Sequence, residues 1–442
     1  MNKADLILSP RWLVTVDDDN RVLDDHSLVI RDGKIAAILP RNEALAAWQG
    51  EHRDLPDHIL APGLINAHTH LAMNLLRGYA DDLPLMDWLN NHIWPAEARW
   101  VSEEFVADGT QLAIAESLLG GTTTVNDMYF FPDVAANMAA ASGIRATVGL
   151  MIIDFPTSWG SGPDEYFSKA IALHDALRDD PLVRTALAPH APYTVSRGPL
   201  ERVSTLASEL DIPVHMHIHE TAAEVDDFVA AHGVRPLQRL HETGLLTPSL
   251  MAVHMTQLTD EEIAGLAHFN VSVVHCPESN MKLASGGCPV AALLKAGVNV
   301  ALGTDGAASN NDLDMFGEMR SAALLGKHLS GNPAEPDAFS ILRMATINGA
   351  RALGLGAVTG SLEVGKAADL MAVSVAPLSM QPVYEPVSHL VYSASRECVE
   401  HVWVAGRQLV DQRRLTTLDE ADLGRRARQW LNRITSTPVE SA

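Results

Sequence analysis

The chain has 442 residues, of which 32 are Lys or Arg and 55 are Asp or Glu, so its formal net charge is −23. Hydrophobic residues make up 47% and charged residues 20%, a globular composition that excludes disordered and fibrous classes. Surfaces that bind phosphate normally carry a positive field. The acidic balance therefore argues against nucleic acid and anionic membranes as partners.

The cysteines and the apolar runs indicate in which cellular compartment the protein is found. Cys276, Cys288 and Cys398 are too few and too scattered for a disulfide framework. No apolar run reaches the length of a signal peptide or the ~20 residues of a membrane span. We therefore expect a cytoplasmic protein. The 19 histidines exceed what packing requires, and histidine is the commonest metal ligand, so their positions guide the search for a site.

The pattern of apolar and polar residues changes twice along the chain. Residues 1–60 contain short apolar runs joined by turns, and the Asp-Gly pair at 32–33 predicts a hairpin. In residues 61–364 short β-like runs alternate with long amphipathic stretches, and in residues 365–442 short β runs return before a last helix. Because neither end has a core of its own, we expect 1–60 and 365–442 to form one composite β-sandwich domain beside a catalytic domain over 61–364.

The central region contains eight apolar runs, each followed by a candidate helix. Repeated β–α units produce parallel strands, and eight of them predict a closed (β/α)8 TIM barrel, an α/β fold. An open doubly wound sheet is the alternative, but no Gly-rich dinucleotide fingerprint follows any run. The eight runs are 64–70, 122–127, 145–152, 183–190, 212–219, 250–254, 271–275 and 298–304.

Most of these runs end in a histidine or an acid, at the edge where a TIM barrel carries its chemistry. His68 and His70 are two residues apart, so in a strand both rings can face the barrel axis. His254 ends the sixth run, and Asp305 follows the eighth. A carboxylate directly after a buried strand is costly unless it is paired or bound to a metal.

The fifth run carries His215, His217 and His219 on one face, followed by Glu220. Spacing alone cannot choose the metal ligand among the three histidines. Three His and one Asp would make a site for a divalent ion. Nitrogen and oxygen ligands without thiolate suit Zn²⁺ and fit Fe²⁺ or Mn²⁺ less selectively.

Five motifs in this order resemble the amidohydrolase superfamily over essentially the whole chain. Further motifs, including Ala-Pro-His-Ala-Pro-Tyr at 188–193 and His-Cys-Pro-Glu-Ser-Asn at 275–280, are similar to the methylthioadenosine/S-adenosylhomocysteine deaminase group. The five motifs are Pro-Gly-Leu-Ile-Asn-Ala-His-Thr-His at 62–70, His-x-x-Glu at 217–220, His254, Gly-Thr-Asp at 303–305 and Gly-Lys-Ala-Ala-Asp at 365–369.

This resemblance implies a single Zn²⁺, because the fourth run has no Lys that could bridge two metals. The implied ligands are His68, His70, His217 and Asp305.

The resemblance also implies catalytic roles for Glu220, His254 and Asp305. Glu220 would contact the purine and protonate its N1, His254 would hold the attacking water, and Asp305 would take a proton from that water. Glu97 would bind the ribose hydroxyls, and His190 would contact the sugar or the purine. The predicted reaction is hydrolytic removal of the 6-amino group from an adenosine-type nucleoside.

Several alternatives remain open. A guanine-type deaminase or an s-triazine chlorohydrolase of the same branch shares much of the pattern. The cytidine-deaminase fold needs H-x-E with P-C-x-x-C, which this chain lacks. A metal-binding scaffold without activity would have little use for Glu220 and His254 beside the ligands. We expect a small-molecule nucleoside as the partner and allow for a homo-oligomer.

Overall fold

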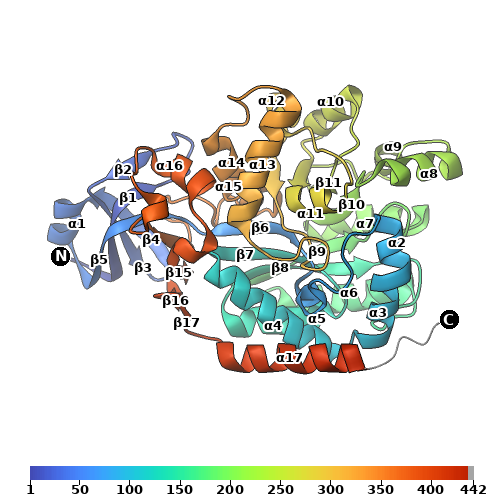
Figure 1. The fold of residues 1–442 in the computed structure, drawn as a ribbon, viewed down its shortest axis with the longest axis horizontal. Coiled ribbons are helices and arrows are strands. Elements are labelled where there is room, and N and C mark those ends of the chain that lie inside the picture. The colour runs from blue at the N-terminus through green and yellow to red at the C-terminus, as the bar shows by residue number, and fades with distance from the viewer. Residues whose placement is uncertain (437–442) are drawn as a thin grey trace.

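A computed structural model describes residues 1–436 (Figure 1). Eight parallel strands follow one another in sequence order around the first sheet. A parallel bridge between Thr69 and Asp305 brings the chain after the last strand back to the first. The predicted barrel is thereby confirmed. Its strands are β6 (Leu64–Thr69), β7 (Thr122–Met128), β8 (Arg145–Ile152), β9 (Val183–Pro189), β10 (Val214–Ile218), β11 (Leu250–His254), β12 (Ser272–His275) and β13 (Val300–Leu302).

Gly303 allows the last strand to approach the first. A Cβ atom at this position would lie 2.8 Å from both the backbone nitrogen and the Cβ of His68. The amide of Asp305 then donates to the carbonyl of His68 at 3.0 Å. A side chain at position 303 would therefore push apart the two strand ends that carry predicted metal ligands.

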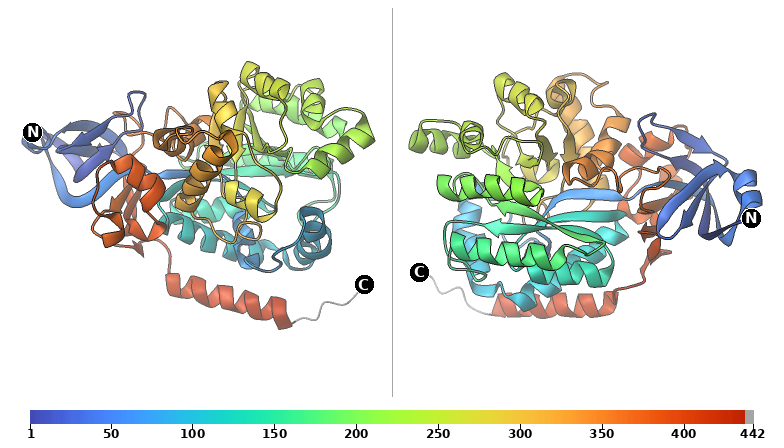
Figure 2. Two further views of the ribbon diagram at one scale, coloured as in Figure 1. Left: turned by 45° about the horizontal axis from the view of Figure 1, so that its top comes forward. Right: turned by 180° about the vertical axis from the view of Figure 1, so that it is seen from behind.

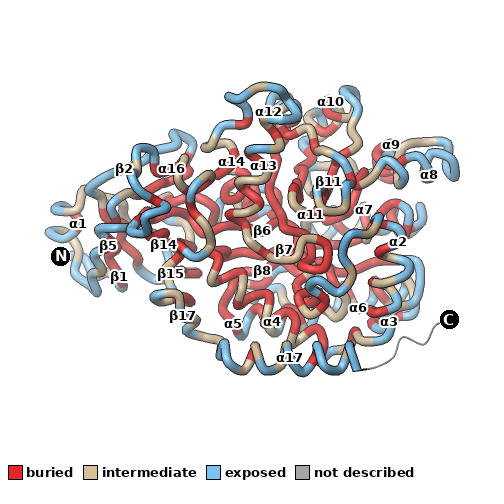
Figure 3. Tube along the Cα trace, viewed as in Figure 1, coloured by how far each residue is buried: buried red, intermediate tan, exposed pale blue. Residues whose placement is uncertain are grey.

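Helices connect the barrel strands and cover their outer side (Figures 1 and 3). The α-helices from the first barrel strand onward are α2 (Leu85–Trp88), α3 (Trp94–Trp100), α4 (Glu103–Leu119), α5 (Pro132–Ser142), α6 (Pro163–Leu177), α7 (Arg197–Leu210), α8 (Ala222–His232), α9 (Pro236–Glu242), α10 (Asp260–His268), α11 (Pro277–Lys282), α12 (Val290–Lys295), α13 (Met315–Ser330), α14 (Ala338–Met344), α15 (Ile347–Ala352), α16 (Pro386–Ser388) and α17 (Glu420–Ser436). Short 3-10 or π turns are η1 (Leu71–Leu76), η2 (Leu89–Ile93), η3 (Leu378–Met380), η4 (His389–Ser393) and η5 (Arg396–Cys398).

The two chain ends share a second, mixed sheet of nine strands. They therefore form one small domain together, as the sequence predicted. The order of strands in this sheet is β17-β16-β15-β14-β5-β1-β3-β4, with β2 paired to β1, so the C-terminal β14 lies directly beside the N-terminal β5. Helix α1 (Arg41–Ala47) links β4 to β5. The strands are β1 (Asn2–Val14), β2 (Val22–Asp24), β3 (His26–Arg31), β4 (Lys34–Pro40), β5 (Trp48–Pro62), β14 (Leu370–Ser374), β15 (Val399–Val404), β16 (Arg407–Asp411) and β17 (Arg414–Leu415).

Residues from both ends form one core in this small domain. Leu8 and Leu60 from the N-terminal part pack in one cluster with Leu370 and Trp403 from the C-terminal part. Burying each large side chain contributes roughly 1.5–3 kcal/mol, so neither end would be stable without the other. The boundaries at 60 and 365 stay a prediction.

A buried ion pair joins the small domain to the barrel. Arg145 at the start of β8 donates to Asp369, which precedes β14, with Nε–Oδ2 at 2.8 Å and Nη2–Oδ1 at 3.2 Å. Asp369 also accepts from the backbone amide of Ala405 at 2.7 Å. Asp369 is the last residue of the Gly-Lys-Ala-Ala-Asp motif. This motif therefore has a structural role, because it forms the joint between the small domain and the barrel.

The last helix lies along the outside of the barrel (Figure 2). Trp430 of α17 donates from Nε1 to Asp108 of α4 at 2.8 Å, and its ring stacks edge-on against Phe105. Among residues 1–436, no helix is long and apolar enough to cross a membrane.

Candidate active site

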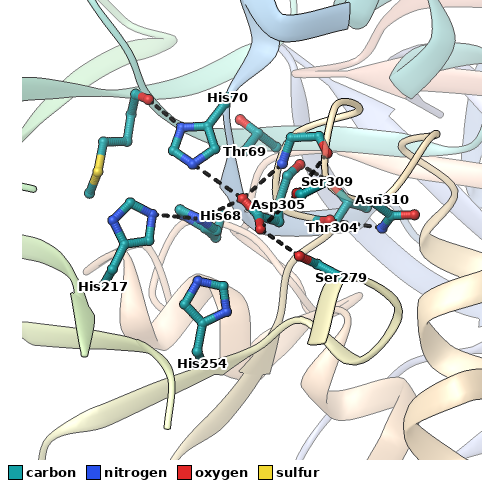
Figure 4. Close-up of polar contacts among 12 residues, drawn as sticks. His68, Thr69, His70, His217, His254, Ser279, Thr304, Asp305, Ser309 and Asn310 are labelled. Carbon is teal, nitrogen blue, oxygen red and sulfur yellow. Dashed lines mark hydrogen bonds and ion pairs between the residues drawn. The ribbon is translucent and has the colours of Figure 1, made fainter. Parts of the chain in front are cut away.

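Four side chains converge at the carboxyl end of the barrel strands (Figure 4). Nε2 of His68 lies 3.2 Å from Nε2 of His217 and 3.2 Å from Oδ1 of Asp305. Nε2 of His70 lies 3.1 Å from the same Oδ1. Ligands that surround Zn²⁺ tetrahedrally at about 2.0–2.2 Å stand about 3.4 Å apart, so the four predicted ligands fit this ion.

Hydrogen bonds on the far side of two rings fix which nitrogen faces the centre. Nδ1 of His70 lies 2.5 Å from the carbonyl oxygen of Met128, and Nδ1 of His217 lies 2.8 Å from that of His190. Each Nδ1 must donate to its carbonyl, which leaves Nε2 with a lone pair for a metal.

His215 supports His68 instead of binding a metal itself. Its Nε2 lies 2.8 Å from Nδ1 of His68, and both residues are buried. For Nε2 of His68 to face the centre with a lone pair, Nδ1 of His68 must donate to His215. His219 turns away, with Nδ1 3.1 Å from the carbonyl of Gln257. The structure thus separates the three histidines that spacing left equivalent.

Asp305 occupies a strained position, with a φ of 63°. Such strain is typical of functional sites whose surroundings hold the conformation in place. Oδ2 accepts hydrogen bonds from the hydroxyls of Ser279 at 2.7 Å and Ser309 at 2.9 Å. Burial opposes the charge, but the hydrogen bonds and charges of His68 and His70 outweigh it and hold the pKa of Asp305 well below 3.8. Asp305 is therefore ionised.

Glu220 has the opposite electrostatic environment. Burial first, and then the negative charges of Asp305 and Glu224, raise the pKa of Glu220 well above 4.5. The Glu224 carboxylate accepts from the backbone amides of His219 at 3.1 Å and Glu220 at 2.7 Å, which fixes the turn that carries Glu220. The environment of Glu220 thus favours its protonated form, which can donate a proton.

His254 completes the group beside the ligands. Nδ2 of Asn280 lies 3.0 Å from its Nδ1, so the amide donates there and the proton of the ring sits on Nε2. That Nε2 lies 3.7 Å from Oε2 of Glu220. Burial lowers the pKa of His254 to about 3, so the ring is a neutral hydrogen-bond donor.

A cavity of about 480 Å³ opens in front of these groups and also includes Glu97 and His190 in its wall. Tyr129 donates its hydroxyl to Oε1 of Glu97 at 2.7 Å. Burial raises the pKa of Glu97 to about 7 even though this hydrogen bond favours the charged form. The apolar wall includes Met73, Leu85, Trp88, Leu89, Ile93, Trp94, Met151, Ile153 and Phe155.

His190 lies at the end of β9 and also faces the cavity. Burial lowers its pKa to about 3, so the ring is neutral. Nδ1 lies 2.9 Å from the hydroxyl of Thr194, and the backbone carbonyl accepts from His217. The residue thus contacts a predicted ligand through its backbone and the cavity through its ring.

The structure brings all eight predicted site residues to one end of the barrel and adds several that the sequence did not reveal. Ser279 and Asn280 stand within a recognised motif, but nothing in the sequence shows that they contact Asp305 and His254. Tyr129 and Ser309 carry no sequence signal at all, because their partners lie in other segments of the chain.

Comparisons with known proteins agree with this geometry. The sequence profile of the amidohydrolase family matches residues 59–409. A 5-methylthioadenosine/S-adenosylhomocysteine deaminase from Saccharophagus degradans is 51% identical over 98% of this chain and 97% of its own length. One from Teredinibacter turnerae is also 51% identical, over 97% of this chain and 98% of its own.

Two solved structures share the fold. An adenosine deaminase from Xanthomonas campestris with bound zinc superimposes with a TM-score of 0.98 at 54% identity, over 99% of this chain and 100% of the other. An atrazine chlorohydrolase from Arthrobacter aurescens complexed with zinc has a TM-score of 0.90 at 25% identity, over 96% and 100%. The profile matches most of the chain, and relatives above 50% identity cover nearly its full length, which confirms the resemblance seen in the motifs: this chain belongs to the amidohydrolase family.

Proposed function

We propose that this chain is a zinc-dependent deaminase that removes the 6-amino group of adenosine-type nucleosides, such as 5'-methylthioadenosine and S-adenosylhomocysteine, to give the inosine analogue and ammonia. The observation that carries the proposal is that two carboxyl groups with pKa values displaced in opposite directions, Glu220 upward and Asp305 downward, face one cavity together with His70 and His217. The similarity to the two 5-methylthioadenosine/S-adenosylhomocysteine deaminases and to the zinc-bound adenosine deaminase supports the same reaction.

The chain's own groups divide the work of proton transfer. His68, His70, His217 and Asp305 would hold the ion, and bound Zn²⁺ supplies a Lewis acid that lowers the pKa of a water from 15.7 to roughly 7. The ionised Asp305 accepts a proton from the attacking water. The neutral His254 donates from Nε2 and so orients that water.

Glu220 supplies the acid. Attack at C6 of a purine requires a proton at N1, and the raised pKa of Glu220 favours the protonated form that can supply it. After this transfer Glu220 is a carboxylate, so the proton that Asp305 took from the water goes to the departing amine, and the Glu220 carboxylate takes back a proton from the new hydroxyl at C6. Positioned proton transfer of this kind contributes ~10²–10⁴ in rate.

The other side of the cavity suits a nucleoside. An ionised Glu97 can accept hydrogen bonds from two vicinal ribose hydroxyls, and His190 stands on the same wall. Trp88 and Phe155 provide apolar surface for a thioether tail. A triazine has no diol, so a buried carboxylate in this place favours the nucleoside over the chlorohydrolase reaction.

The decisive variant is Glu220→Gln, which keeps the shape of the side chain but removes the acidic proton that the carboxyl group can transfer. It should retain zinc by elemental analysis and lose ~10²–10⁴ in turnover. A screen of ammonia release with 5'-methylthioadenosine, S-adenosylhomocysteine, adenosine, guanine and a chlorotriazine tests the substrate class. Normal turnover in the variant would refute the role of Glu220 as the acid. Inactivity on the three adenosine compounds would refute the proposed reaction.

A further inference from the structure

A second group of metal-binding side chains lies in the small domain, on a different sheet from the barrel site. His58 belongs to β5, and Glu400 and His401 belong to β15. One ring nitrogen of each histidine and one carboxylate oxygen of Glu400 lie within 4.8 Å of one another. Nε2 of His58 is 2.9 Å from Oε2 of Glu400.

The strand register places these side chains on one face. β14 lies between β5 and β15, where Ser374 pairs with His58 and Ala372 pairs with His401. Paired residues project to the same face of a sheet, so the side chains of His58 and His401 lie on either side of the small side chains of β14. The same face carries the core of the small domain, and the ring of His401 lies 5.7 Å from that of Trp403.

A β-bulge turns Glu400 toward the two histidines. The pairing shifts between Ala372 and Val373, which face His401 and Val399, so Glu400 is the extra residue on β15. Bulges characteristically redirect a side chain. Without the bulge, alternation along the strand would put Glu400 and His401 on opposite faces.

The surroundings of the two histidine rings are compatible with metal binding. Both are buried, and their ring centroids lie 5.8 Å apart. Nδ1 of His401 lies 3.0 Å from Oδ1 of Asp411 and 3.3 Å from both Nε2 of Gln408 and the backbone nitrogen of Gln412. A metal at Nε2 requires the tautomer in which Nδ1 donates to Asp411. Nδ1 of His58 is buried without a hydrogen-bond partner among the described residues, so its ion pair with Glu400 satisfies only half of the ring.

The local charge also favours a cation. Arg53 is the nearby positive group, and its Nη1 lies 3.2 Å from Oδ1 of Asp411. Arg53 therefore offsets Asp411, while Glu400 supplies a further carboxylate beside the two rings. We propose that His58, Glu400 and His401 form a second site for a divalent transition-metal ion of the Zn²⁺ class, which clamps the N-terminal β5 to the C-terminal β15. This site is independent of the proposed reaction.

The set of two nitrogens and one carboxylate oxygen suits Zn²⁺ with water as the fourth ligand. Zinc binding to the full chain, loaded at the barrel site, should be measured by elemental analysis after dialysis against buffered Zn²⁺. We expect two zinc ions per chain in the wild type and one in His58→Gln and His401→Gln, with ammonia release unchanged. His26→Gln, in the same small domain but outside the cluster, is the matched control and should keep two.

Glu400→Gln covers the case in which a buried histidine variant fails to fold, because the Glu400 side chain is 37% exposed. It should weaken the second zinc at least about tenfold in competition with a chromophoric chelator, and Asp411→Asn should weaken it by about 10–100-fold. Added Zn²⁺ should raise the Tm of the wild type and not that of Glu400→Gln. A wild type that binds only one zinc ion, or a Glu400→Gln variant that binds the second as tightly as the wild type, would overturn the proposal.

Discussion

Replacing Tyr129 with Phe should weaken nucleoside binding mainly at low pH. Only the ionised Glu97 can accept from both ribose hydroxyls, so KM should be low above the pKa of Glu97 and rise about tenfold per pH unit below it. Burial places that pKa at about 7. The Tyr129 hydroxyl, 2.7 Å from Oε1, stabilises the charged form, so its removal raises the pKa further.

The magnitude follows from the energy of that hydrogen bond. A hydrogen bond to a charged group contributes about 1.5–3 kcal/mol, and 1.36 kcal/mol corresponds to one pKa unit, so the pKa should rise by about 1–2 units. Below both pKa values the ratio of the two KM values should therefore reach about 10–100, and above both it should approach one. A bound cation would lower both pKa values alike, so the ratio does not depend on it.

The assay is ammonia release from 5'-methylthioadenosine between pH 5.5 and 9, with kcat and KM separated. Because Tyr129 does not touch the reacting atoms, kcat should change little. Glu97→Gln is the control, since adding Tyr129→Phe to it should leave the KM profile unaltered. 2',3'-Dideoxyadenosine, which lacks the diol, should show no difference between wild type and Tyr129→Phe. A constant KM ratio across the pH range, or a loss confined to kcat, would refute the reasoning.

Two further changes test the supports of the site and of the fold. His215→Ala should weaken zinc binding about 10–100-fold in a chelator competition, because His68 loses the group that orients it; unchanged affinity would contradict this role. Asp369→Ala should lower the free energy of unfolding by about 3–5 kcal/mol in a urea titration, because Arg145 is left as an unpaired buried charge. A shift no larger than that of Asp411→Ala, whose side chain is 47% exposed, would argue against a structural joint.

The sequence predicted the barrel well, since its strands are apolar runs set by local composition. The run 145–152 matches β8 and 250–254 matches β11 without adjustment, while the last run, 298–304, shortens to Val300–Leu302. Strand ends are less predictable, because the chain leaves the ladder where a polar side chain finds a partner from another segment. Asp305, just beyond β13, is fixed in this way by the contact of its carboxylate with His68.

The supporting residues could not be predicted for the same reason. His215, His217 and His219 are equivalent in spacing, and only His68 on another strand distinguishes the first from the second. Tyr129 and Glu97 are 32 residues apart and meet because α3 and the end of β7 face one cavity. Their contact depends on tertiary packing, which no local pattern contains.

The same limit applies to the roles of the two central carboxyl groups. Glu220 and Asp305 both follow barrel strands, and in sequence each could be an acid, a base or a ligand. The structure surrounds Asp305 with two imidazoles and two hydroxyls, which keep it charged, and leaves Glu220 with burial and two negative neighbours, which keep it protonated. Environments that displace two pKa values in opposite directions assign the acid and the base. The ionised Asp305 also raises the pKa of Glu220, so each group helps to define the role of the other.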